Sequence, residues 1–349
     1  MRRLTTILVT FVLAAAMGAC SGTGNAIEPT HAAGKPREQY VALADAVLAQ
    51  GAQAWVEADL VKAWRAGPER FDSVVGVVAA FVARSGIGGV KIADEFGYGD
   101  GLGASDAQDA LRSMTAAMHD RVPDRRVLID VVVPQLGCLA WQESASPGTP
   151  GAAGWATATP EARSRMRRCA EAEAAKNPAA TIAAVDGYVR DGGIDVLDLS
   201  AGLRDDAEYA AWGTTRDAAM TAIWAEASRR WGDRVTLQAR KALAHDGAYD
   251  KPAATAEADV HTFVDIPLAN GAKAVDVWTW SQPYRGTTRQ LTDPGLVDNA
   301  LVTALRARRE RGASLWTHMT PSSLQKGLEA DVRAATSIFG TVFVTSGTG

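Results

Sequence analysis

The sequence has few histidines and cysteines, which limits the metal sites that it can form. It contains five histidines and three cysteines. His31 precedes the first expected helix, and His119 and His261 fall in segments expected to be helical. Zinc sites need three or four His or Cys ligands close together. We therefore expect no histidine- or cysteine-based metal site, whereas a carboxylate site for Mg²⁺ or Ca²⁺ stays open.

The sequence also lacks the motifs of nucleic-acid and nucleotide binding. Its formal net charge is -4, and no block of Lys or Arg stands out. A nucleic-acid partner needs a basic face, so none is expected. No Gly-x-Gly-x-x-Gly follows the first expected strand, and there is no phosphate-binding loop. The glycines between Gly97 and Gly103 are typical of a mobile loop at the rim of a fold, and we expect neither a nucleotide nor any other cofactor.

The N-terminus has an apolar run that is too short to be a clear membrane-spanning helix. Arg2 and Arg3 precede this run, Leu4–Met17, and Met17-Gly18-Ala19-Cys20 ends it with small residues. The segment resembles a bacterial lipoprotein signal, although Met17 stands where Leu is commonest. The resemblance implies a signal peptide over 1–19, a lipid on Cys20, a flexible tether over 20–37 and attachment to the extracytoplasmic face of the cell membrane. An ordinary secretory signal is the alternative.

Two cysteines remain if Cys20 carries a lipid. In an oxidising compartment, Cys138 and Cys169 are expected to form a disulfide. Two free buried thiols are the alternative.

From residue 38 onward, segments with strand character alternate with amphipathic segments. The expected strands are Trp55–Leu60, Val90–Glu95, Val127–Val133, Ile194–Ser200, Val235–Arg240, Ala274–Trp280, Ser314–His318 and Val342–Thr345. The expected helices are Glu38–Gln50, Phe71–Arg84, Ser105–Arg121, Pro160–Ala175, Ala179–Arg190, Asp206–Trp231, Leu296–Arg311 and Ser322–Phe339. The segment Ala254–Leu268 is the weakest helix, and a short strand over Thr262–Ile266 is its alternative.

Eight strands that alternate with helices predict an α/β fold, a single (β/α)₈ TIM-type barrel over residues 38–349. No eighth helix follows the last strand, and the extra N-terminal helix Glu38–Gln50 is expected to cover its place. A doubly wound open sheet is the alternative. The long loop Gln135–Thr159 follows the third strand and is a candidate lid, or an insertion without function.

Polar side chains alternate with apolar ones along most of the expected strands. If the aliphatic positions face the helices, the other positions point into the barrel. This alternation places several carboxylates in the barrel interior, together with Lys91 and Arg240. Unpaired buried charges cost several kcal/mol each. The interior is therefore either a salt-bridge network or a functional site, and clusters of carboxylates of this kind serve acid–base chemistry.

Carboxyl groups near strand ends suit the cleavage of glycosidic bonds. One carboxyl group protonates the leaving oxygen, and a second one attacks the anomeric carbon or activates water. Glu95 is the first candidate, because it ends its strand beside the glycine-rich loop, and Asp94 is expected to point the other way. Asp130 or Asp198 is the expected partner, and the next candidates are Glu57 and Asp59.

Aromatic and polar residues near the later strands are the candidate substrate contacts. Indole rings offer flat apolar area to the C–H face of a sugar. The polar side chains provide hydrogen bonds to a carboxylate or a hydroxyl group. The candidate substrate-binding residues are Lys91, Gln238, Arg240, Trp278, Trp280, Gln282, Tyr284, Trp316 and His318. Each tryptophan has ordinary packing as its alternative role, and for His318 a structural role is the alternative.

In these features the chain resembles secreted (β/α)₈ glycoside hydrolases in general. The resemblance implies a carbohydrate, or another small polar molecule, as substrate. It does not extend to one family. Ser200 and His318 stand where one large group has glutamates, and the run Asp195–Ser200 lacks the Asp-x-Asp-x-Glu spacing of chitinases. The resemblance therefore implies a class and no particular catalytic residues, and a membrane-anchored barrel that binds a glycan without cleaving it is the alternative function.

Overall fold

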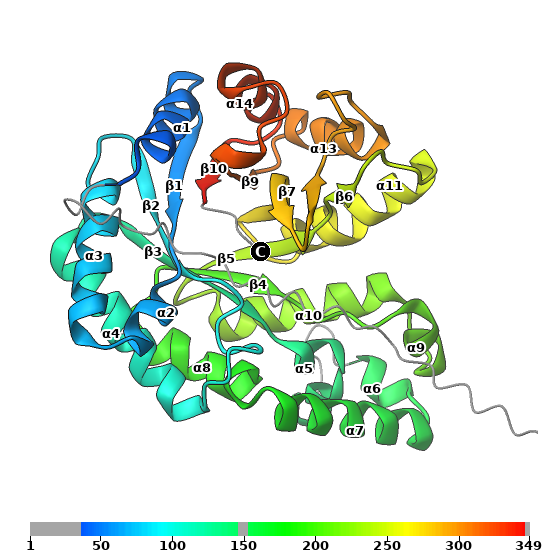
Figure 1. The fold of residues 1–349 in the computed structure, drawn as a ribbon. Coiled ribbons are helices and arrows are strands. Elements are labelled where there is room, and N and C mark those ends of the chain that lie inside the picture. Colours follow the sequence, from blue (N-terminus) through cyan, green and yellow to red (C-terminus); the bar gives the residue numbers. More distant parts are fainter. Residues whose placement is uncertain (1–35, 146–152, 346–349) are drawn as a thin grey trace, which may run out of the picture.

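The computed structural model describes residues 36–145 and 153–345, and it contains a closed barrel of eight parallel strands (Figure 1). The strand order around the barrel is β5-β4-β3-β2-β1-β10-β9-β7, and pairing between β5 and β7 closes it. The barrel strands are β1 (Gln53–Glu57), β2 (Ile87–Ala93), β3 (Arg126–Val132), β4 (Val196–Ser200), β5 (Thr236–Ala242), β7 (Ala274–Tyr284), β9 (Leu315–Met319) and β10 (Thr341–Val344). The predicted TIM-type barrel is confirmed, and the open doubly wound sheet is wrong.

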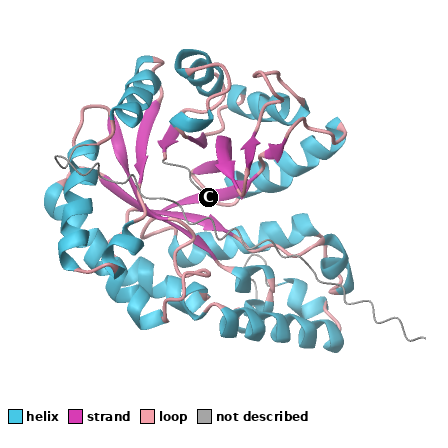
Figure 2. Cartoon of the chain, in the orientation of Figure 1, coloured by secondary structure: helices cyan, strands magenta, loops and turns pink. Residues whose placement is uncertain are grey.

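Helices surround the strands (Figure 2). They are α1 (Glu38–Ala49), α2 (Leu60–Arg65), α3 (Pro68–Val82), α4 (Ala104–Arg121), α5 (Pro134–Gly137), α6 (Ala153–Thr157), α7 (Pro160–Lys176), α8 (Ile182–Asp191), α9 (Asp206–Ala211), α10 (Arg216–Trp231), α11 (Ala253–Val260), α12 (Ile266–Ala269), α13 (Ala300–Glu310) and α14 (Leu328–Thr336). Short 3₁₀ turns lie at η1 (Ala140–Ser144), η2 (Pro178–Ala180) and η4 (Pro321–Ser323).

Helix α1 packs against α14, β1 and β10. The extra N-terminal helix therefore lies beside the last strand, where it was expected. Its buried residues Tyr40, Leu43, Ala44 and Val47 follow helical spacing, which explains why the sequence pattern was readable.

Two regions differ from the predicted elements, and the weakest predicted helix, Ala254–Leu268, is confirmed. Strand β7 continues to Tyr284 and forms antiparallel pairs with β8 (Thr287–Gln290), which in turn pairs with β6 (His245–Asp246). The segment from α11 to α12 is helical throughout and includes one π-helical stretch, η3 (His261–Asp265), so the alternative strand is wrong. The expected helix Asp206–Trp231 is divided into α9 and α10.

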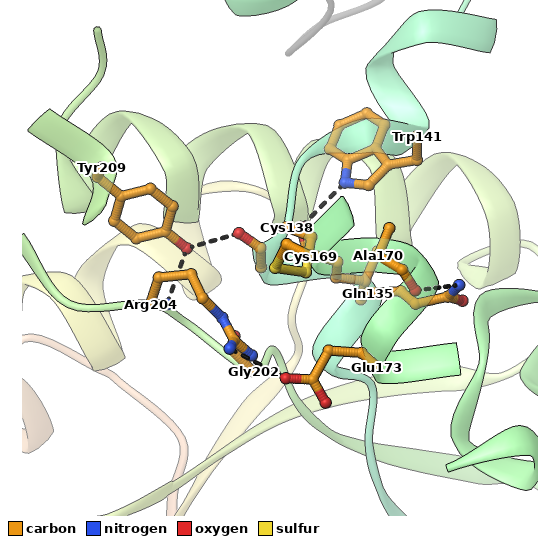
Figure 3. The surroundings of a disulfide bond; sticks show 11 residues. Gln135, Cys138, Trp141, Cys169, Ala170, Glu173, Gly202, Arg204 and Tyr209 are labelled. Atoms are coloured by element: carbon orange, nitrogen blue, oxygen red, sulfur yellow. Dashed lines mark hydrogen bonds and ion pairs between the residues drawn. A yellow bond between two sulfur atoms is a disulfide. The ribbon is translucent and has the colours of Figure 1, made fainter. Parts of the chain in front are cut away.

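The predicted disulfide is present. Cys138, at the end of α5, and Cys169, in α7, are bonded with their Cα atoms 5.6 Å apart (Figure 3). Hydrogen bonds surround the bridge: Gln135 donates to the carbonyl of Ala170, and Tyr209 donates to the carbonyl of Gly137. The first part of the expected lid is thus short helical structure held by a covalent bond, and residues 146–152 lie outside the described residues.

The lower half of the barrel, toward the N-terminal ends of the strands, is filled by apolar side chains. A separate buried cluster contains Trp55, Leu128, Val196, Ala274, Trp316 and Phe343. The ring centroids of Trp55 and Trp316 lie 5.0 Å apart, and those of Trp316 and Phe343 lie 5.3 Å apart. Gly89 makes room for this packing, since a Cβ there would lie 2.7 Å from Cζ3 of Trp55.

The predicted signal peptide, Cys20 and nearly all of the tether lie outside the described residues. In 36–145 and 153–345, no helix is both long and apolar enough to cross a membrane.

Candidate functional site

A ring of alternating charges lies above the apolar cluster, toward the C-terminal ends of the strands. Lys91 on β2 contacts Glu57 on β1, Asp94 after β2 and Asp130 on β3, with Nζ–O distances of 3.0, 2.7 and 3.2 Å. Arg240 on β5 contacts Asp94 at 2.9 Å and also pairs with Asp130.

His318 on β9 completes the ring. Its Nδ1 lies 2.7 Å from Oε2 of Glu57, and its Nε2 lies 2.8 Å from Oδ2 of Asp276 on β7. Nε of Arg240 lies 3.7 Å from the same Asp276 oxygen. Each cation thus joins carboxylates on different strands, and the ring connects six of the eight barrel strands.

The ion pairs hold their members in the charged state. Burial would raise the pKa of Glu57, but Lys91 and His318 lower it to about 2. Burial also opposes charge on His318, but Asp276 and Glu57 outweigh it and raise the pKa of the imidazole. Lys91 is fully buried, and its neighbouring carboxylates raise its pKa despite the burial and the repulsion from Arg240. The predicted inward positions of these residues are confirmed.

The aromatic ring of Phe343 separates the charged ring from the apolar cluster. The centroid of its ring lies 4.7 Å from that of His318, and Nζ of Lys91 lies 5.9 Å from it. The barrel interior therefore changes from apolar to charged within one layer of side chains.

Glu95 stands just beyond the end of β2, and its local backbone is held firmly. Its φ is +46°, an uncommon left-handed conformation for a residue other than glycine. The next residue, Phe96, is buried against Tyr188 with ring centroids 5.2 Å apart. The carboxylate of Asp100 accepts hydrogen bonds from the backbone N–H groups of Gly97 and Leu102, both at 2.8 Å. The loop that positions Glu95 is therefore internally bonded.

The carboxyl group of Glu95 differs electrostatically from its neighbours. The residue is 8% exposed, and its buried Oε2 has no hydrogen-bond donor among the described residues. Burial raises its pKa to about 7, because the attraction of Arg240 and Lys91 does not compensate for the lost hydration and the repulsion from Asp94. Glu95 can therefore exchange a proton near neutral pH, directly beside groups that stay ionised.

Asp198 on β4 is the second carboxyl group whose proton is stabilised. It is fully buried, and burial together with the nearby Asp276 raises its pKa well above the usual range. Protonated Asp198 can donate a hydrogen bond to Asp276, which makes the two a buried acid–carboxylate pair. Gln238, its register partner on β5, is buried too. Asp198 therefore sits deep in the site, where burial favours its protonated form.

Asp94 and Asp59 do not lie where the alternation of strand residues predicts. Pairing between β2 and β3 shifts register between Lys91 and Ala93, and Asp94 consequently points toward Lys91 and Arg240 rather than away. Asp59 does not join the ring. It caps α2, because its Oδ1 accepts from the N–H groups of Val61 and Lys62. Burial raises the pKa of this capping carboxyl group to about 6.

Trp280 and Trp316 do not form walls of the upper site. Pairing between β7 and β9 shifts register between Val277 and Ser281, which breaks the expected alternation. Trp280 consequently packs in the core outside the barrel, with its ring centroid 6.3 Å from that of Phe339. Trp316 faces inward as predicted, but it belongs to the apolar cluster in the lower half.

The other three predicted substrate contacts on β7 lie together. The indole N–H of Trp278 donates to Oε1 of Gln282 at 3.1 Å, and the rings of Trp278 and Tyr284 meet edge to face with centroids 5.4 Å apart. All three side chains are partly exposed. Because parallel strands have their C-terminal ends on the same side of the barrel, this aromatic cluster and Glu95 share one end of the molecule.

Residue types near the ring do not favour a metal ion. The carboxylates already have Lys91, Arg240 and His318 as counterions. In the described ranges, no group of three or more His, Cys, Asp or Glu side chains is arranged to hold a metal.

Comparisons with known proteins do not identify a family. No protein-family model and no curated protein matches the sequence. Among solved structures, one similar protein is from Burkholderia cenocepacia J2315 and was suggested to be a phosphonomutase, with 13% identity, 88% and 91% coverage of the two chains and a TM-score of 0.43.

Two further structures are similar at the same low level. A 2,3-dimethylmalate lyase of the PEP mutase/isocitrate lyase superfamily has 10% identity, 88% and 81% coverage and a TM-score of 0.39. An endo-glycoceramidase II from Rhodococcus sp. has 13% identity, 86% and 74% coverage and a TM-score of 0.41. These enzymes differ in their chemistry, and we infer no function from the similarities.

Proposed function

We propose that the protein is a glycosidase-like hydrolase that acts at the C-terminal end of the barrel, on a carbohydrate or a related polar substrate. The observation that supports this most is the contrast between Glu95, with its pKa raised to about 7, and carboxylates that neighbouring cations keep ionised. Cleavage of a glycosidic bond needs one group of each kind.

In this proposal Glu95 is the proton donor. At neutral pH the carboxyl group of Glu95 is protonated in a large fraction of the molecules. It transfers this proton to the leaving oxygen as the bond breaks. Glu57 is the ionised partner, because its side chain retains 13% exposure and its pKa is lowered to about 2. Asp94 is the alternative partner, with 17% side-chain exposure.

Asp130 and Asp198, the partners expected from the sequence, fit this role less well. Asp130 is fully buried and paired with both Lys91 and Arg240. Asp198 is fully buried, and its raised pKa favours the protonated form over the carboxylate that a nucleophile or base requires. We therefore assign both residues to the support of the site.

The cluster of Trp278, Gln282 and Tyr284 is the proposed sugar subsite. It offers two aromatic surfaces joined by a side-chain amide, and it lies at the same end of the barrel as Glu95. This arrangement suits a ligand that is apolar on its C–H face and polar at its edges.

A panel of glycans tests the proposal, with both reducing-end release and binding measured on the chain from Ser21 onward. We expect release from at least one glycan, with a loss of at least 100-fold in Glu95→Gln. Glu69→Gln, a change at an exposed carboxyl group on α3, is the matched control and should retain activity. Release that persists undiminished in Glu95→Gln would contradict the assignment of the proton donor.

The second candidate function is ligand binding without cleavage. It is favoured by the ring itself, in which Lys91, Arg240 and His318 engage four carboxylates. Binding of a glycan without release in the same panel would support this function and rule out hydrolysis of that glycan.

We also propose that the chain is a lipoprotein held at the extracytoplasmic face of the cell membrane through Cys20. This rests on the sequence, where an Arg pair, an apolar run and small residues precede the cysteine. Cys20→Ser should move the protein from the detergent-rich to the aqueous phase on detergent partitioning. An unchanged distribution would favour an ordinary secretory signal.

A further inference from the structure

A second cavity lies in the helical layer, away from the ring of charges. It has a volume of about 270 Å³ and lies between α10 and the helical segments that follow β3. Figure 1 shows α5, α6 and α7 beside α10 in this part of the molecule. The lining is mostly apolar and includes Leu139, Met166, Trp212, Ala219 and Ala222, and its polar side chains are Gln142, Thr214 and Thr221.

The walls of this cavity are fixed rather than loose. Leu139 directly follows Cys138, and Met166 lies one helical turn before Cys169, so the disulfide joins two of the walls (Figure 3). Trp212 packs edge to face on Tyr209, with ring centroids 5.6 Å apart. The Tyr209 hydroxyl group in turn donates to the carbonyl of Gly137. A preformed cavity of this kind does not have to be organised by its ligand.

Gln142 gives the cavity one unsatisfied polar group. The residue is only 4% exposed, and its Oε1 has no donor among the described residues. Gly154 leaves room beside this oxygen, because a Cβ at that position would lie 3.2 Å from it. A buried amide oxygen without a donor is destabilising, and a ligand N–H or O–H group relieves this cost.

We propose that this cavity binds a small, mostly apolar ring compound that carries one hydrogen-bond donor, and that the donor pairs with Oε1 of Gln142. An apolar cavity of roughly 150 Å³ accepts benzene, so the larger volume suits a bicyclic ring. The exposed residues Gly154, Ala218 and Thr221 mark the side on which the cavity reaches solvent. This site is separate from the barrel and does not depend on the proposed hydrolase activity.

Indole and indene provide a matched pair of probes. The two have nearly the same shape, and only indole has an N–H group. We expect calorimetric titration of the purified full chain to show indole binding about 5-fold tighter than indene, as one neutral hydrogen bond provides. Gln142→Met should bring the two affinities close together. Equal binding of both probes by the unaltered chain, or no binding of either, would overturn the proposal.

Two variants test the location. Ala222→Leu fills the buried part of the cavity and should weaken the binding of both probes at least 10-fold. Ala225→Leu, on the same helix but outside the lining, should leave both affinities unchanged. If Ala222→Leu does not fold, Ala218→Phe blocks the exposed mouth without disturbing the core. Unchanged binding in the folded filling or blocking variant would place the probes elsewhere and refute the site.

Discussion

The carboxyl groups in the barrel interior differ from one another in pKa, because each has different neighbours. Glu57 and Asp276 have lowered pKa values because His318 lies between them, and Asp198 has a raised pKa because it is buried beside Asp276. Six carboxyl groups share this region with three cations, so full ionisation would leave an uncompensated buried charge. Protons on Glu95 and Asp198, whose pKa values are both raised, reduce that excess from three negative charges to one.

Asp198→Asn tests whether Asp198 is neutral in the folded protein. Asparagine is also neutral and can donate a hydrogen bond to Asp276, so we expect the free energy of unfolding at pH 7 to change by less than about 1 kcal/mol. Asp198→Ala should lower the free energy of unfolding by about 2 to 4 kcal/mol, since it leaves a cavity and an unpaired carboxylate oxygen on Asp276. Urea unfolding at pH 7 measures both. An equal loss in the two variants would show that the charge of Asp198 matters.

The strands determine which side chains point into the barrel, and the alternation of residues in the sequence predicts these directions only in part. Regular alternation placed Asp130 and Arg240 correctly, since their strands pair with β4 and β7 without a register shift. It also placed Lys91 and His318 correctly, although pairing of β1 with β2 shifts before Lys91 and pairing of β7 with β9 shifts beside His318. It failed for Asp94, because a register shift lies just before this residue.

Trp280 was misplaced for the same reason, and Asp59 was misplaced because its strand had already ended. Register shifts depend on pairing with a neighbouring strand, which a single stretch of sequence does not encode. The extra pairing of β7 with β8 was missed for the same reason.

The disulfide between α5 and α7 should stabilise the segment after β3. In the chain-entropy model, a closed loop of 31 residues contributes about 3 to 4 kcal/mol. We expect Cys138→Ser to lower the urea midpoint of the oxidised protein and to have little effect on the reduced protein. An equal loss in both redox states would mean that packing at Cys138, and not the covalent bond, is responsible.

Gly89 and Gly76 predict opposite responses to alanine. At Gly89 in β2 a Cβ would overlap the ring of Trp55, so Gly89→Ala should destabilise by about 1 to 3 kcal/mol. At Gly76 in α3 nothing lies within 4 Å, and alanine should stabilise the helix by about 0.5 to 1 kcal/mol. Thermal unfolding of both variants measures this. A Gly89→Ala variant as stable as the unaltered chain would contradict the packing described for the lower barrel, and destabilisation by Gly76→Ala would contradict the open surroundings of that residue in α3.

The whole molecule combines a fold that the sequence predicts with a site that it predicts incompletely. The count and order of strands were readable because each helix and strand has its own hydrophobic period. The ring of charges was not readable as a ring, because it joins residues that are distant in sequence, such as Glu57 and His318.

The stability of the whole protein should depend on pH in a direction set by the ring and by Glu95. The pKa of Glu95 rises from 4.5 to about 7 on folding, so the folded state binds this proton more tightly than the unfolded chain. Stability is then lost as pH rises from about 4.5 to 7, by an amount on the order of 3 kcal/mol. The raised pKa of His318 adds a further loss as the pH rises through its folded value, above 6.5.

On the acid side, the lowered pKa values of Glu57, Asp94 and Asp276 make stability fall as these groups are protonated. We therefore expect maximal stability at about pH 5. Asp59 and Asp198 also have raised pKa values and add losses of the same sign. Glu95→Gln removes one of these losses and should raise the thermal midpoint at pH 8 while changing it little at pH 5. A variant that follows the same pH profile as the unaltered chain would show that Glu95 is not protonated on folding.

The contact between Trp55 and Gly89 restricts which residues related sequences can have at position 89. The indole ring occupies part of the space that a side chain at position 89 on β2 would need. In descendants of a common ancestor, glycine should persist at 89 even where a smaller residue replaces Trp55, because a Cβ there would also lie 2.4 Å from the backbone carbonyl oxygen of Arg126. A lineage that keeps the tryptophan is thereby restricted to glycine on the neighbouring strand, however much the charged ring above it diverges.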